Sequence, residues 1–99
     1  MENSVLRVEI LPEAGAKTYS IFHKMADREL LWRNRRVRPA AYPPGSGFDD
    51  TWAGGWDDMF PNAVPEDWEG ETLHDHGETW TQRWDWEIVA AGEDEACVH

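Results

Sequence analysis

The sequence has little cysteine, little positive charge and no long apolar run. Its one cysteine, Cys97, has no partner for an internal disulfide, which favours a reducing compartment. Nine Lys and Arg stand against 20 Asp and Glu, and the formal net charge of −11 repels the phosphates of nucleic acids and anionic membranes. No run approaches the roughly 20 apolar residues of a membrane helix. The first ten residues, MENSVLRVEI, lack the basic segment and the apolar core that are typical of a signal peptide. We therefore expect a soluble, cytoplasmic protein with neither nucleic acid nor membrane as a partner.

Helical periodicity is also lacking, whereas the alternation typical of strands is clear near the N-terminus. Residues 5–12 alternate apolar and charged side chains, and Pro12 ends the run. Residues 16–25 are rich in β-branched and aromatic side chains, and residues 30–32 form a short third apolar segment. The sequence therefore predicts an all-β fold that opens with an antiparallel meander over residues 5–33.

Residues 34–72 show no periodicity and are predicted to form a long loop. The basic run at 33–38 is interpreted as a solvated segment rather than an anion site, because the whole chain is acidic. A structureless stretch of this length is uncommon in a compact domain and is often functional. Order returns at 73–91, which is predicted to be a strand that begins at a His-Gly pair. One face of that strand would carry Trp80, Trp84, Trp86, Ile88 and Ala90.

The predicted strands are too few to bury their own apolar faces. A chain of 99 residues hides a smaller fraction of its surface than a larger domain does. All-β sandwiches commonly run to about 200–250 residues. We therefore expect residues 1–99 to form one part of a larger β-sandwich.

The segment "LHDHGETW", residues 73–80, holds the densest cluster of reactive side chains. On a straight strand His74, His76 and Glu78 would follow one another along one face, each about 6.6–7 Å from the next. Three ligands at this spacing cannot easily reach one metal ion unless Gly77 bends the chain. A metal-binding β protein therefore stays an alternative, although no metal or other cofactor is predicted. A zinc deaminase is excluded, because its Pro-Cys-x-x-Cys motif is absent.

A carbohydrate site is the second interpretation of this region. Indole rings stack on the flat C–H faces of sugars, while carboxylates, amides, imidazoles and guanidinium groups bond the hydroxyls. The alternative is a tryptophan-rich core, and composition leaves both open. The candidate sugar-binding residues are Trp56, Asp57, Asp58, Asn62, His76, Glu78 and Arg83.

Three segments resemble one known family. They are "VEILPEAGAKTYSIFHKMADRELLW" at 8–32, "GGWDDMFPN" at 54–62 and "DHGETWTQRW" at 75–84. In content and order they resemble the galactose mutarotase-like, or aldose 1-epimerase, superfamily, which carries a Gly-Gly…Phe-Pro segment followed by a His-Gly before a Trp-containing strand. The resemblance covers nearly the whole chain and implies the N-terminal part of a β-supersandwich.

The resemblance also implies a chemistry. Members of the family interconvert sugar anomers with a glutamate as general base and a histidine as general acid. His76 matches the His-Gly that contacts substrate, whereas the base and the principal acid would lie beyond residue 99, so no catalytic residue is assigned within this chain and no epimerase activity is expected of it. Many epimerases follow His-Gly with an aromatic or aliphatic residue and then an arginine. Here Glu78 and Trp80 occupy that stretch and Arg83 comes later, which leaves the sugar open. A small stand-alone carbohydrate-binding or interaction module is the alternative function.

Overall fold

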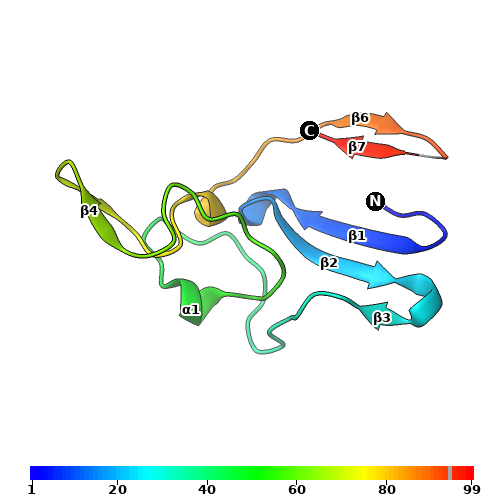
Figure 1. Ribbon diagram of the computed structural model, residues 1–99, viewed down its shortest axis with the longest axis horizontal. Coiled ribbons are helices and arrows are strands. Elements are labelled where there is room, and N and C mark those ends of the chain that lie inside the picture. Colours follow the sequence, from blue (N-terminus) through cyan, green and yellow to red (C-terminus); the bar gives the residue numbers. More distant parts are fainter. Residues whose placement is uncertain (94) are drawn as a thin grey trace.

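The computed structural model describes residues 1–93 and 95–99 and shows antiparallel strands with very little helix (Figure 1). The predicted all-β class is thereby confirmed. The strands form a three-stranded sheet, β1-β2-β3, and two hairpins, β4-β5 and β6-β7. No helix among the described residues is long and apolar enough to cross a membrane. The strands are β1 (Leu6–Leu11), β2 (Lys17–His23), β3 (Arg28–Glu29), β4 (Glu66–Trp68), β5 (Glu71–Leu73), β6 (Ile88–Ala91) and β7 (Ala96–Val98).

The meander matches the prediction in its first two strands and differs in the third. Strands β1 and β2 pair in register from Leu6 opposite His23 to Leu11 opposite Lys17, with a bulge at Tyr19. The third strand was expected at residues 30–32 but lies at Arg28–Glu29. A single 3-10 turn at Lys24–Ala26 is followed by Asp27, which has a positive φ, and reverses the chain. Strand β3 therefore begins at Arg28, two residues before the predicted start, and pairs with β2.

A partly buried polar cluster joins β2 to β3 and to the start of the basic run. Glu29 accepts hydrogen bonds from the Ser20 hydroxyl at 2.6 Å and from the backbone N–H groups of Ile21 and Leu31. It also pairs with Arg33, whose guanidinium lies 4.9 Å from the Tyr19 ring centre. The first arginine of the run is therefore structural, whereas Arg35, Arg36 and Arg38 are exposed.

Two regular elements interrupt the predicted loop over 34–72, so that prediction was partly wrong. A one-turn helix, α1 (Phe48–Thr51), follows Gly47 and carries Asp49 and Asp50 in its first turn, where carboxylates favour the positive end of the peptide dipoles. The hairpin β4-β5 turns through Glu69 and Gly70, both with positive φ, as a type I′ turn requires.

The single strand predicted over 73–91 was wrong. Residues 74–77 form a turn, Thr79–Thr81 form a 3-10 turn, and β6 begins only at Ile88. The reason is the lack of a partner: between 82 and 86 only two backbone hydrogen bonds reach the meander, from Gly15 N to Gln82 O and from Trp84 N to Pro12 O. Part of the predicted face survives, because Trp84, Trp86, Ile88 and Ala90 all line one groove, while Trp80 is buried elsewhere.

The chain leaves much apolar surface open. The buried apolar side chains of the described residues are Ala14, Phe48, Ala53 and Trp80. The accessible surface is 7561 Å², compared with about 5,800 Å² for a compact monomer of 11.4 kDa. The radius of gyration is 15.5 Å, compared with about 12.6 Å for a compact domain of this length. The hairpin β4-β5 projects beyond the end of the meander, whereas β6-β7 runs alongside β1 (Figure 1).

Candidate functional site

The two motifs at 54–62 and 75–84 lie side by side. Phe60 and Gly77 form a parallel bridge, and the Glu78 N–H donates to the Phe60 carbonyl at 2.8 Å. The Thr79 hydroxyl donates to the Asp58 carbonyl at 2.5 Å. Gly77 is required at this junction, because a Cβ there would overlap the Phe60 backbone and because its φ is +71°. Two loops distant in sequence thus form one surface.

His76 is held in an uncommon conformation at the centre of this surface. Its φ is 61°, within the turn that the Gly77 N–H closes on the His74 carbonyl. The left-handed region costs an ordinary residue about 1–2 kcal/mol. The imidazole lies flat on the Phe48 ring, with centroids 3.8 Å apart and planes 5° apart. Residues that persist in such conformations are over-determined by their surroundings and cluster at functional sites.

The His76 ring is covered on the face that stacks on Phe48 and at Nδ1, and it is exposed elsewhere in part. The Nδ1 atom is buried and lies 3.0 Å from an Asp75 carboxylate oxygen, although the pair does not have hydrogen-bond geometry. The side chain is 27% exposed, so its exposed part lies on the other ring atoms. The ring therefore presents its remaining surface to solvent in a fixed orientation.

His76 is the first ring of an aromatic row that continues through Phe48 and Trp52 to Trp32. Phe48 stacks on Trp52 at 5.8 Å, and Trp52 stacks on Trp32 at 5.2 Å. The buried Trp80 meets Phe48 edge-on at 5.2 Å. Helix α1 sets this arrangement, because it buries Phe48 and ends where Trp52 begins. The row gives the surface a rigid apolar base, and offset stacks of this kind stabilise beyond the area that they bury.

Asp57 lies behind the aromatic row rather than on the surface. Its carboxylate is 3.1 Å from Lys17 Nζ, and both side chains are buried, at 5% and 7% exposure. It also accepts a 2.9 Å hydrogen bond from the Trp52 indole, while Lys17 donates to the Gly54 carbonyl at 3.0 Å. Asp57 therefore fixes the orientation of Trp52 and ties the loop to β2.

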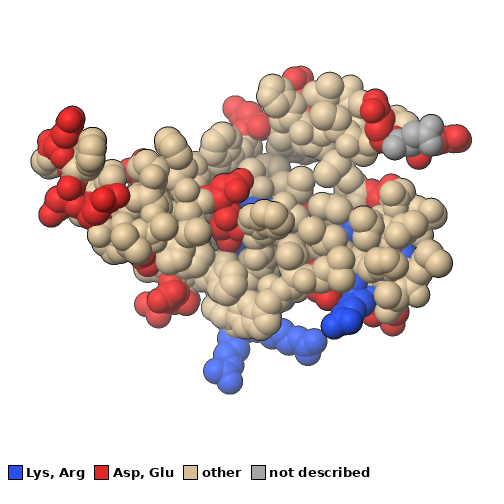
Figure 2. Space-filling view, in the orientation of Figure 1, with Lys and Arg blue, Asp and Glu red and all other residues tan. Residues whose placement is uncertain are grey.

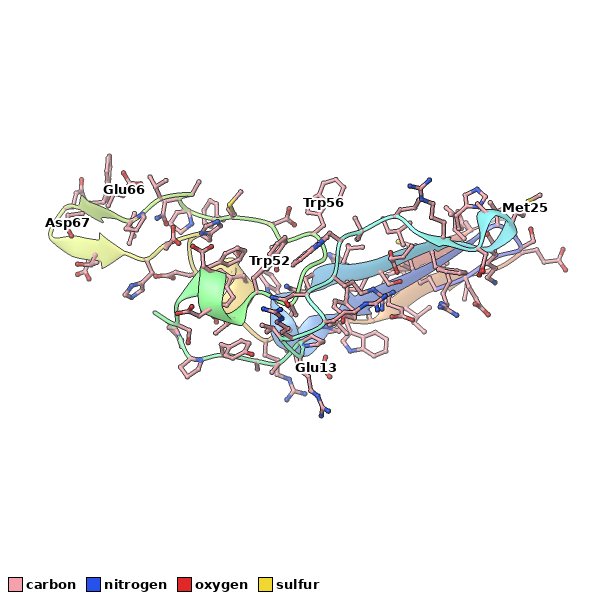
Figure 3. The ribbon with its side chains drawn as sticks, turned by 90° about the horizontal axis from the view of Figure 1, so that it is seen from below. Glu13, Met25, Trp52, Trp56, Glu66 and Asp67 are labelled. Atoms are coloured by element: carbon pink, nitrogen blue, oxygen red, sulfur yellow. The ribbon has the colours of Figure 1, made fainter. Side chains whose placement is uncertain are left out.

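Asn62 is a second buried support. Its amide donates to the carbonyls of Val64 and His74, at 2.7 and 2.8 Å, and so joins the end of the 54–62 loop to the His76 turn. The side chains of Trp56, Asp58 and Glu78 are exposed (Figure 3 shows Trp56 projecting from the ribbon and Trp52 beside α1). Arg83 lies apart, in a cleft of about 160 Å³ with Glu13 and Asp85. The structure thus brings the segments of Asp58 and Glu78 together beside His76, and it places Asp57 and Asn62 in buried supporting positions. Trp56 lies on the part of the loop that bonds β2, and Arg83 lies outside the site.

The list of candidate residues from the sequence omitted Phe48, Trp52 and Lys17. The first two had a usable signal, because residues four apart share one face of a helical turn and Gly47 with two following aspartates favours a helix start. Lys17 had none, because it is buried only by the folding of the 54–57 segment onto β2.

Metal ligands do not converge here. In the part of the chain that the structure describes, no three His, Cys, Asp or Glu side chains are placed to hold a metal ion. The turn at 74–77 explains this, since it leaves His74 exposed and directs His76 onto Phe48.

Comparisons of the chain with models of protein families, with curated proteins and with solved structures found no match.

Proposed function

We propose that the chain binds a neutral sugar on the surface formed by α1, residues 56–62 and residues 76–78. The observation that carries this proposal is the fixed imidazole of His76, which lies flat on Phe48 and is partly open to solvent. Sugar binding requires a rigid apolar platform with a few directed hydrogen-bonding groups beside it. A preorganised histidine avoids the entropy cost of ordering a side chain on binding.

The neighbouring groups suit the roles that a sugar would need. Trp56 is 63% exposed and offers an indole face for stacking. Asp58 and Glu78 offer exposed carboxylates to accept bonds from hydroxyl groups. Asp57 and Asn62 would act indirectly, by positioning Trp52 and the His76 turn. The net charge of −11 favours a neutral sugar over a phosphorylated one.

The resemblance to the galactose mutarotase-like superfamily supports the same proposal. The two short motifs that carry it, at 54–62 and 75–84, meet at the Phe60–Gly77 bridge. We propose that the chain corresponds to the sugar-contacting N-terminal part of such a fold and holds no general base of its own. A stand-alone carbohydrate-binding module would use the same surface, so one binding experiment tests both versions.

The test is a titration of the chain with galactose and with glucose, followed by tryptophan fluorescence and by calorimetry. His76→Ala removes the fixed ring, and we expect it to weaken binding at least about tenfold, or about 1.4 kcal/mol. His74→Ala is the matched control, because His74 is exposed two residues away and stacks on no ring. We expect its affinity to stay within about twofold of the parent.

The absence of saturable binding to either sugar would contradict the proposal. Equal losses in the two histidine variants would also contradict it, because the effect would then not depend on the fixed ring. Far-ultraviolet circular dichroism of both variants confirms that the comparison is made between folded chains.

A further inference from the structure

A second surface, far from the His76 turn, is a groove of about 660 Å³ between β1 and the hairpin β6-β7. Figure 1 shows the hairpin running alongside β1, with the N-terminal residues between them, and Figure 2 shows the hollow on this face. The volume lies within the range of sites that bind ligands or segments of partners. Its apolar lining comes mainly from Val8, Ile10, Trp84, Trp86, Ile88 and Val98.

The face of the hairpin β6-β7 that borders the groove exposes apolar side chains and, in the described part of the chain, is not packed against another layer. Among the residues that the structure describes, strands β6 and β7 pair only with each other, and Ile88 is 62% exposed. An isolated two-stranded hairpin is at best marginally stable in water, and a third strand or a packed layer is needed to hold it. Because strand side chains alternate, Ile88 lines the groove while Val89, which is 59% exposed, is absent from its lining.

The edge of β1 that borders the groove accepts a strand. The Val8 N–H donates to the Met1 carbonyl at 2.8 Å, and the N-terminal amino group donates to the Val8 carbonyl at 2.9 Å. Trp84 N–H bonds the Pro12 carbonyl at the other end of the edge. Between them the alternation of the ladder directs the backbone groups of Ile10 toward the same edge. The N-terminal residues already pair with this edge in the antiparallel direction, so the edge is suited to an antiparallel strand.

Charge identifies the kind of segment. The groove and the hairpin beside it carry Asp85, Glu87, Glu93 and Glu95, and red atoms surround the hairpin in Figure 2. A second copy of the chain would bring another net charge of −11 to this place. Complementary charge favours a basic partner and repels an acidic one.

We propose that this groove binds an extended segment of a partner protein in which apolar residues alternate with Lys or Arg. The segment lies antiparallel to β1 and displaces the residues at the N-terminus from its edge. Its apolar side chains fill the groove against Ile10, Trp86 and Ile88, and its basic side chains face Asp85 and Glu87. Main-chain hydrogen bonds supply affinity and the alternate side chains supply specificity, as in other cases of strand addition.

The test uses an end-blocked peptide of about six residues in which valine and lysine alternate, the length of an ordinary strand. Binding is followed by the fluorescence of Trp84 and Trp86 and by amide hydrogen exchange. We expect saturable binding and slower exchange at Ile10. We expect Ile88→Asp to weaken binding at least about tenfold, although it adds a negative charge that would attract the peptide. Val89→Asp adds the same charge on the other face of β6 and should leave the affinity within about twofold.

Several outcomes would overturn the proposal. Equal affinity for a peptide of alternating valine and glutamate would remove the role of charge. Equal effects of the two aspartate variants, or unchanged exchange at Ile10, would show that the peptide lies outside the groove. Dimerisation of the chain without peptide, abolished by Ile88→Asp alone in analytical ultracentrifugation, would assign the groove to a second copy instead.

Discussion

Glu29 is the residue whose ionisation matters most to the meander. Burial acts to raise its pKa, but hydrogen bonds from Ser20, Arg33 and the backbone N–H groups of Leu31 and Ile21 outweigh burial and lower the pKa from 4.5 to about 2. Between pH 4.5 and 2 the carboxylate of Glu29 is mostly protonated in the unfolded chain but remains ionised in the folded chain. The stabilisation by this carboxylate is therefore present above pH 4.5 and is lost as the pH falls toward 2.

We expect acid to destabilise the chain through protonation of Glu29. The shift contributes about 2 kcal/mol, after an allowance for the 23% of the side chain that solvent screens. Urea unfolding at a series of pH values measures it, and Glu29→Gln should flatten the profile between pH 5 and 2. Glu71→Gln, at an exposed carboxylate on β5, is the matched control and should retain the slope. A parent-like slope in Glu29→Gln would refute the assignment.

At the scale of elements, the junction of two loops depends on a glycine. Gly77→Ala places a methyl group against the Phe60 backbone and also pays the strain of a φ of +71°. Gly70→Ala, in the β4-β5 turn, meets the same kind of φ, at +89°, with nothing within 4 Å. We expect a loss of about 1 kcal/mol from Gly70→Ala, the cost of the left-handed conformation alone. Gly77→Ala should cost at least about 2 kcal/mol more, as overpacking does, and should abolish sugar binding. Denaturant unfolding and the sugar titration measure both, and equal losses in the two variants would contradict the required close approach.

Local patterns predicted the pairing of β1 with β2 but not the hairpin β4-β5, whose two short strands, EDW and ETL, are mostly polar and show no clear alternation. Strands β1 and β2 alternate and are joined by a short turn, so their pairing could be foreseen. Residues 82–86 alternate as clearly but bond the meander at only two backbone positions, and alternation alone carries no information about whether a partner exists. The candidate site shows the same limit. His76 could be singled out from its His-Gly motif, but its stacking on Phe48 depends on a turn and a helix that approach through space.

At the scale of the whole molecule, apolar surface exceeds what the chain can cover. The excess over a compact monomer is about 1,800 Å², close to the total area that a standard interface buries. We therefore expect broad thermal unfolding in which circular dichroism and tryptophan fluorescence do not coincide, because the hairpins and the meander lack a shared core. One sharp transition seen equally by both probes would contradict this expectation and favour a self-sufficient module.

The anchoring of the loop to β2 also sets an order of folding. Lys17 bonds the Gly54 carbonyl across 37 residues, and Thr18 and Trp56 exchange two backbone hydrogen bonds beside it. Closing a flexible loop of this length costs about 3 kcal/mol of chain entropy, whereas the β1-β2 turn closes over a few residues. The meander is thus the template and the His76 surface is assembled late upon it, in a single closure. We therefore expect this surface to open before the meander in the native state, so its amides should exchange faster than those of β1 and β2.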